Sequence, residues 1–114
     1  MNPDEIASIF RDTRLVELSI DFASKKVSLS IERFRGNALE TRNLELIGVT
    51  EISIFEEFGS QWIENVKVIQ SCNCLYISLD PYDETHAEDQ RDNQTFRASL
   101  CKFSPDTTEM AEQG

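Results

Sequence analysis

The stretch LVELSIDFASKKVSLSIERF, residues 15–34, decides the fold, because its apolar residues recur at every second position. These positions are Val16, Leu18, Ile20 and Phe22 in the first half and Val27, Leu29 and Ile31 in the second. A period of two places all of these side chains on one face of a strand pair. The stretch therefore predicts an antiparallel hairpin with one buried face, turning at residues 23–26.

Length and composition predict one small globular domain. The chain has 114 residues, of which 39% are hydrophobic and many are β-branched, which argues against a disordered chain. We expect the domain to cover residues 1–103, followed by a flexible acidic tail over 104–114. No apolar run approaches the roughly 20 residues that cross a bilayer. The first residues, MNPDEIASIF, do not resemble a signal peptide, so we expect a cytoplasmic protein.

The remaining segments predict one short helix and further strands. Asn2 can cap a helix that starts at Pro3, and the helix should run over residues 3–11 and dock on a sheet. Alternating apolar residues predict strands near 39–47, 49–55, 64–71, 75–80 and 94–103. Gly48 is either a tight turn or the bend of one long strand, and Asn73 should turn a second hairpin.

The connections between these strands are short and contain no crossover helix, which excludes a parallel sheet. The fold class is therefore α+β, mostly β: an antiparallel meander of about seven strands that forms a sandwich or half-barrel, with one short N-terminal helix.

Cysteine usage gives no disulfide framework, because the three cysteines are an odd number. In an extended strand Cys72 and Cys74 would share a face, but a metal would need more ligands, and His86 belongs to another segment. We expect Cys72, Cys74 and Cys101 to be buried or half-buried thiols.

The sequence shows no catalytic motif. It contains no glycine-rich phosphate loop and no Gly-x-Ser-x-Gly elbow, and its one histidine, His86, lies in the acidic loop over residues 82–93. That loop offers many carboxylates, but their spacing does not fit a calcium-binding loop. We interpret it as a long, exposed and solvated segment. We expect no enzyme, no catalytic residue, no cofactor and no metal.

Aromatic residues beside carboxylates favour a protein partner, whereas the net charge by itself is better explained as keeping the protein soluble. The net charge of −10 would repel nucleic acid and anionic membranes and attract a basic protein. Trp62 and Tyr82 stand beside carboxylates, and such aromatics anchor interfaces while the charges steer the approach. Phe55 and Phe58 are better explained as core residues, and Trp62 fits either role. The predicted partner-binding residues are Glu56, Glu57, Trp62, Tyr82, Asp83, Glu84, Glu88 and Asp89.

Residues 12–57 resemble small bacterial domains of the immunity-protein type, encoded beside polymorphic toxins, and related uncharacterised bacterial families. The resemblance is carried by the helix exit RDTRL at residues 11–15, by LSIDFASKKVSLSI and by LELIGVTEISI. The chain departs from the family at Arg11-Asp12, where members often carry a His-Asp pair. It implies a toxin-neutralising protein of a bacterial cytoplasm that binds a basic toxin domain without catalysis.

Two alternatives belong to other classes of function. The first is a small-ligand binding module that holds its ligand inside a curled sheet. The second is a structural domain that forms a homodimer through an unpaired sheet edge, although the pattern does not identify that edge.

Overall fold

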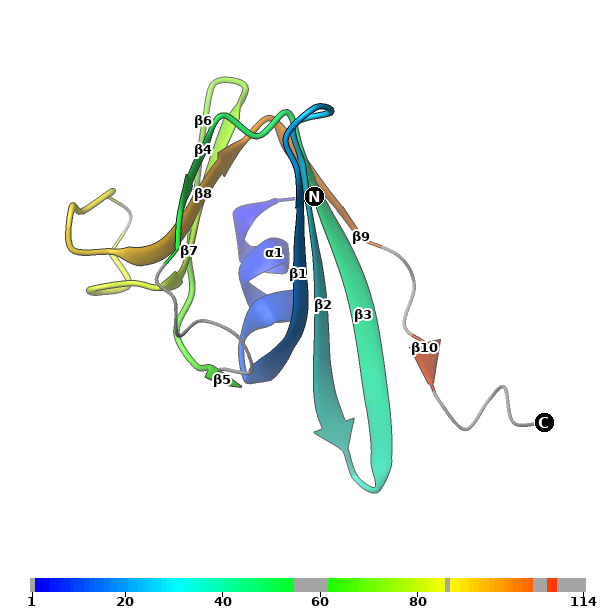
Figure 1. Cartoon of the computed structure of the whole chain (residues 1–114). Helices are drawn as coiled ribbons and strands as arrows, with labels where there is room; N and C mark the ends of the chain where they lie inside the picture. The colour runs from blue at the N-terminus through cyan, green and yellow to red at the C-terminus, as the bar shows by residue number, and fades with distance from the viewer. Residues whose placement is uncertain (1, 55–61, 86, 104–106, 109–114) are drawn as a thin grey trace.

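The computed structural model of the chain describes residues 2–54, 62–85, 87–103 and 107–108. The protein is mostly β, with antiparallel strands in two sheets that curl as a half-barrel around one N-terminal helix (Figure 1). This confirms the predicted fold class. The described elements are α1 (Pro3–Phe10), β1 (Thr13–Asp21), β2 (Lys26–Arg35), β3 (Ala38–Ile47), β4 (Glu51–Ser53), β5 (Trp62–Ile63), β6 (Lys67–Ser71), β7 (Cys74–Asp80), β8 (Asn93–Ala98), β9 (Leu100–Phe103) and β10 (Thr107–Thr108).

The two sheets differ in size. The first has the order β10-β3-β2-β1-β5, and β9 also pairs with β3, while the second has the order β4-β8-β7-β6. Within the predicted tail, the structure describes only Thr107 and Thr108, which pair with Thr41 and Glu40 of β3.

Helix α1 begins where the sequence predicts. The Asn2 side chain accepts a hydrogen bond from the Glu5 amide at 2.9 Å, and Glu5 accepts one from the Asn2 amide at 2.9 Å. This reciprocal pair satisfies amides that a helix start leaves open. Figure 1 shows α1 lying between the two sheets, and its residues Ile6 and Phe10 are fully buried, so the predicted docking of the helix is confirmed.

The opening hairpin is confirmed, but the prediction of which side chains are buried is wrong in part for its first strand. Val27, Leu29 and Ile31 of β2 are buried as predicted. Val16 was expected beside them and is instead 48% exposed. The pairing shifts between Leu15 and Glu17, so Val16 is the extra residue of a β-bulge. A bulge reverses the alternation, which turns Leu15 inward and Val16 outward.

Phe22 was also expected on the buried face and is 81% exposed. Strand β1 ends at Asp21, so Phe22 belongs to the turn and the strand alternation no longer applies to it.

A shared corner joins the two sheets. β3 of the first sheet leads through Gly48 to β4 of the second, and β8 of the second leads through Ser99 to β9 of the first. The Ser99 amide donates to the Ile47 carbonyl at 2.8 Å. Gly48 has φ +69°, and a Cβ there would lie 2.9 Å from the Ser99 Cβ. Of the two options for Gly48, the structure therefore shows the bend around a corner.

The same corner corrects the prediction for the last strand. Leu100 was expected on one face with Phe96 and Ala98, but it is exposed, while Cys101 is buried. The bend at Ser99 changes the phase of the alternation. Cys74 is half-buried, whereas Cys72 is exposed, contrary to expectation, because it lies with Asn73 in the predicted turn of the second hairpin.

Candidate functional site

Part of the outer face of the second sheet is covered by the connection from β7 to β8, of which the structure describes residues 81–85 and 87–92. Tyr76 and Ser78 point to this outer face and are buried, although a solvated loop would have left them exposed. The acidic segment is therefore not the free, solvated run that the sequence suggested. It folds back on the sheet and is held there by specific polar contacts.

Lys67 is the centre of these contacts. It lies on β6 opposite Ser78, so its side chain points to the same outer face, and that side chain is 1% exposed. Its Nζ lies 3.1 Å from each carboxylate oxygen of Asp92, 3.0 Å from Asp83 Oδ1 and 2.9 Å from the Ala87 carbonyl oxygen. A buried ammonium is tolerated when its donors are satisfied in this way.

Asp92 is the matching anion, with a side chain that is 0% exposed. Besides Lys67, it accepts hydrogen bonds from the Tyr76 hydroxyl at 2.8 Å, the Tyr82 amide at 2.9 Å and the Asp89 amide at 3.1 Å. Both of its oxygens are therefore occupied, and two backbone amides of the loop are tied to one carboxylate. We call Lys67, Tyr76, Asp83 and Asp92 the Lys67 cluster.

The pKa shifts in the cluster follow from these contacts. Burial alone would raise the pKa of Asp92, but the donors from Tyr82, Tyr76 and Lys67 outweigh it and hold the pKa below its ordinary value. Burial alone would lower the pKa of Lys67, but Asp83 and Asp92 raise it. Burial, followed by the bond to Asp92, raises the pKa of the Tyr76 hydroxyl. The cluster therefore holds one cation and two anions at neutral pH.

A second set of contacts ties the loop to β8. Arg97 donates to both carboxylate oxygens of Glu88, at 3.1 Å and 2.7 Å, and to Glu51 at 3.0 Å. Its guanidinium also lies over the Tyr76 ring, 5.3 Å from the ring centroid. Hydrogen bonds to Glu88 and then to Glu51 raise the pKa of Arg97.

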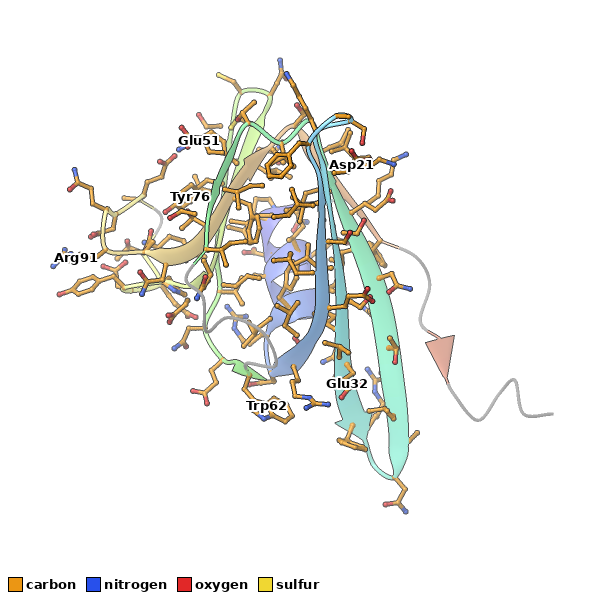
Figure 2. All side chains as sticks on the ribbon, in the orientation of Figure 1. Asp21, Glu32, Glu51, Trp62, Tyr76 and Arg91 are labelled. Carbon is orange, nitrogen blue, oxygen red and sulfur yellow. The ribbon has the colours of Figure 1, made fainter. Side chains whose placement is uncertain are left out.

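The tip of the loop presents an aromatic side chain that is fixed in place. Tyr82 is exposed, and the Arg91 guanidinium stacks on it 3.6 Å from the ring centroid. Arg91 in turn donates to both oxygens of Asp89, at 2.9 Å and 2.8 Å. These bonds lower the pKa of Asp89 to about 2. In Figure 2 the Arg91 side chain lies at the outer end of the loop, far from the first sheet.

Most of the predicted partner-binding residues meet in this loop. Tyr82, Glu84 and Glu88 are exposed, while Asp83 and Asp89 are half-buried. Each of the four carboxylates has a cation nearby: Asp83 has Lys67, Glu84 has Arg11 at 3.6 Å, Glu88 has Arg97 and Asp89 has Arg91.

The other predicted partner-binding residues are not part of this surface. Trp62 is exposed, but it pairs with Arg14 at the end of β1, and Figure 2 places it well away from Arg91. Glu56 and Glu57, like Phe55, Phe58 and His86, lie outside the described residues.

Sequence reasoning missed Lys67 and Arg97 as the residues that organise the loop. Lys67 interrupts the apolar run VKVI, where an alternating strand normally places a solvated side chain. The sequence offers one signal for the role of Lys67. It is a single cation in a strand, and the same chain contains a loop rich in carboxylates that could pair with it. Charge pairing across 25 residues is not visible in a local pattern.

Three further observations bear on the classes of function. In the described part of the chain, His, Cys, Asp and Glu side chains do not gather in groups of three that would suit a metal ion. Among the described helices, none is long and apolar enough to span a membrane. Helix α1 lies between the two sheets in Figure 1, and its Ile6, Ala7, Ile9 and Phe10 are buried.

Comparison with known proteins gives no assignment: no family model, curated protein or solved structure matches this chain.

Proposed function

We propose that this protein is a non-enzymatic binding domain whose loop surface over residues 81–92 receives a basic protein. The form of this function that we favour is a toxin-neutralising immunity protein of a bacterial cytoplasm, with a basic toxin domain as its partner. The observation that supports the proposal most is the buried Lys67–Asp92 pair beneath the loop.

The Lys67–Asp92 pair holds the loop between β7 and β8 in place, and this loop has no apolar core of its own. Ordering a loop costs conformational entropy, about 1–2 kcal/mol for each backbone residue. In this protein the cost is met during folding, through the amides of Tyr82 and Asp89 that Asp92 holds. A surface that is ordered before the encounter binds more tightly than one that must be ordered during it.

The exposed groups on this fixed loop suit a basic partner. Tyr82 offers a ring whose position is set by Arg91, and aromatic residues of this kind are frequent interface anchors. Glu84 and Glu88 are paired with arginines, yet they remain exposed. A carboxylate has about four acceptor sites, so each can take further donors from Lys or Arg of a partner.

The overall charge supports the same partner class. At a net charge of −10, the protein attracts a basic surface over a distance of about 8–10 Å at physiological salt. Electrostatic steering of this kind raises the association rate, and the rate should fall as salt is added.

The test is a binding measurement with the basic C-terminal domain of a secreted protein encoded by the neighbouring gene. We expect a complex at low salt, and we expect co-expression of this chain to restore growth of cells that express the basic domain. Tyr82→Ala should weaken binding by tenfold or more, on the order of an interface anchor. Glu84→Gln should weaken it by about threefold.

The matched control is Glu45→Gln, which removes a carboxylate from the exposed face of the first sheet. It should leave affinity and rescue unchanged. The proposal fails if the neighbouring basic domain does not bind at low salt, or if Tyr82→Ala and Glu45→Gln bind equally well.

A further inference from the structure

Strand β1 has an open side within the described residues. It pairs with β2 from Arg14 to Asp21, but with β5 only through Thr13 and Arg14. Residues 17–21 of β1 therefore have one described strand beside them, on the β2 side. The backbone groups of residues 17–21 on that other side have no strand partner among the described residues, and such groups of an edge strand can pair with another chain.

The inward-facing residues of β1 show the same lack of cover. Leu18 and Ile20 are half-buried, whereas the residues directly opposite them on β2, Leu29 and Val27, are 1% and 0% exposed. Both pairs face the same interior, so the greater exposure of Leu18 and Ile20 comes from the side of β1 that faces away from β2. A strand added at this flank would cover the remaining apolar area of Leu18 and Ile20.

The outward-facing residues of β1 set the charge of an acceptable partner. Glu17, Ser19 and Asp21 alternate with the apolar residues and are exposed. Opposite charges facing each other across a strand pair stabilise it, and like charges destabilise it. An incoming strand should therefore carry Lys or Arg on its outer face and apolar residues on its inner face.

A second copy of the chain is a poorer occupant. If two β1 strands paired antiparallel about Ser19, Glu17 of each copy would face Asp21 of the other, with repulsion on both sides of the centre. The bulge at Val16 also disturbs a regular ladder at this edge. Charges and bulges on an edge are the usual means of preventing self-association, and they select for a partner of opposite charge.

We propose that β1 binds an extended protein segment of alternating basic and apolar residues, which joins the first sheet as an added antiparallel strand. This is a site separate from the loop over β7 and does not depend on it. Val16 and Phe22, the exposed apolar residues at the two ends of this edge, extend the contact beyond the paired residues. Main-chain bonds supply affinity in this mode of recognition, and alternate side chains supply specificity.

The test uses three capped octapeptides and the full chain: one alternates Lys and Val, one alternates Glu and Val, and one places all its Lys before all its Val. Backbone amide shifts are followed by NMR at low salt. We expect the alternating Lys-Val peptide to shift the amides of residues 17–21 and to protect every second one, the amides that point away from β2. The Glu-Val peptide should not bind, and the block peptide should bind at least about fivefold more weakly.

The matched variants are Glu17→Gln/Asp21→Asn at the edge and Glu45→Gln on the interior strand β3 of the same sheet face. The first should weaken binding of the Lys-Val peptide by about tenfold, as expected for two exposed charge pairs, and the second by less than about twofold. Asn at position 21 keeps an oxygen that can accept from the Ser24 amide in the turn.

Three results would overturn the proposal. They are equal binding of the Lys-Val and Glu-Val peptides, shifts from the Lys-Val peptide confined to residues outside β1, and a dimer in sedimentation whose β1 amides are protected without any peptide. The last result would assign the edge to a second copy. Loss of the loop-mediated partner by Tyr82→Ala leaves this experiment unchanged, so the two proposals fail separately.

Discussion

The interior between the two sheets and the Lys67 cluster are both buried, but they are held by different forces. The interior is filled by aliphatic and aromatic side chains such as Phe10, Leu29 and Phe96, and its stability grows with the apolar area removed from water. The Lys67 cluster consists of a few charge-assisted hydrogen bonds over the outer face of the second sheet.

This difference teaches how each region should respond to damage. Apolar packing is spread over many contacts and does not change with pH. A buried ion pair is concentrated in two groups, and removing one partner leaves an uncompensated charge. Substitutions in the interior should therefore cost more unfolding free energy than substitutions at exposed charges, with the buried ion pair between them.

Phe10→Ala should have the largest effect, because the side chain is fully buried in the core cluster. Replacing a buried Phe by Ala costs about 3–5 kcal/mol of unfolding free energy. Phe22→Ala makes the same chemical change at an exposed turn position and should cost less than about 0.5 kcal/mol. Urea denaturation of both variants measures the difference in unfolding free energy. Similar losses in the two variants would show that Phe10 is not packed in the interior.

Lys67→Met should come next, with a loss of about 3 kcal/mol, because Asp92 would remain buried without its cation. The damage should be local at first. Hydrogen exchange at the amides of Tyr82 and Asp89 should speed up while amides of β2 remain protected. Unchanged exchange in the loop would show that Lys67 does not hold it in place.

Gly48→Ala should cost about 2 kcal/mol, because residue 48 has positive φ and its new Cβ would meet Ser99. Gly36→Ala is the matched control, since Gly36 has φ +65° but no atom within 4 Å of a Cβ. It should cost about 1 kcal/mol, the backbone strain alone. Thermal melts of the two variants separate backbone strain from the close approach to Ser99. Equal losses of stability would show that the contact with Ser99 does not constrain residue 48.

Changes in pH should affect the cluster before the interior. The folded pKa of Asp92 lies below 3.8, so its contribution is present above that value and is lost as the pH falls below about 4. The folded pKa of Lys67 lies above 10.5, so its contribution is present below 10.5 and is lost as the pH rises through the raised value. Protection factors of the loop amides, which compare the observed exchange rate with the intrinsic rate at each pH, should be highest at pH 7 among pH 3, 7 and 11. A loop equally protected at all three would contradict this.

Arg91→Met should have the smallest effect on the free energy of unfolding, because its pair with Asp89 is exposed and screened by solvent. Set beside Lys67→Met, it compares the same change at an exposed and a buried cation of one loop. If Arg91→Met lost as much unfolding free energy as Lys67→Met, burial would not explain the difference expected between the two ion pairs.

The fold was predictable where one rule governs a whole segment. The alternation of Val27, Leu29 and Ile31 and the cap at Asn2 are local signals, and both were correct. The predictions failed where one residue changes the phase of a strand. The bulge at Val16 and the bend at Ser99 both arise from how strands fit into the two sheets, which alternation alone does not reveal.

The candidate site was predictable only in part. Tyr82 and the carboxylates of residues 83–89 were selected by composition, and the structure gathers the selected residues of this segment in one loop. The order of that loop depends on Lys67 and Arg97, which come from two different strands. Their pairing is a property of the second sheet, and it depends on the strand order β8-β7-β6.

The corner at Gly48 and Ser99 has a consequence for dividing the chain. Two separate passages of backbone cross there from one sheet to the other, running in opposite directions. Neither sheet can therefore be expressed as an autonomous fragment, because each would lose the continuation of strands that it shares. A gene split in the turn at Gly36 leaves both crossings in the C-terminal piece, so reassembly of such halves would depend on the β2–β3 ladder, on the β1–β5 pairing and on the docking of α1.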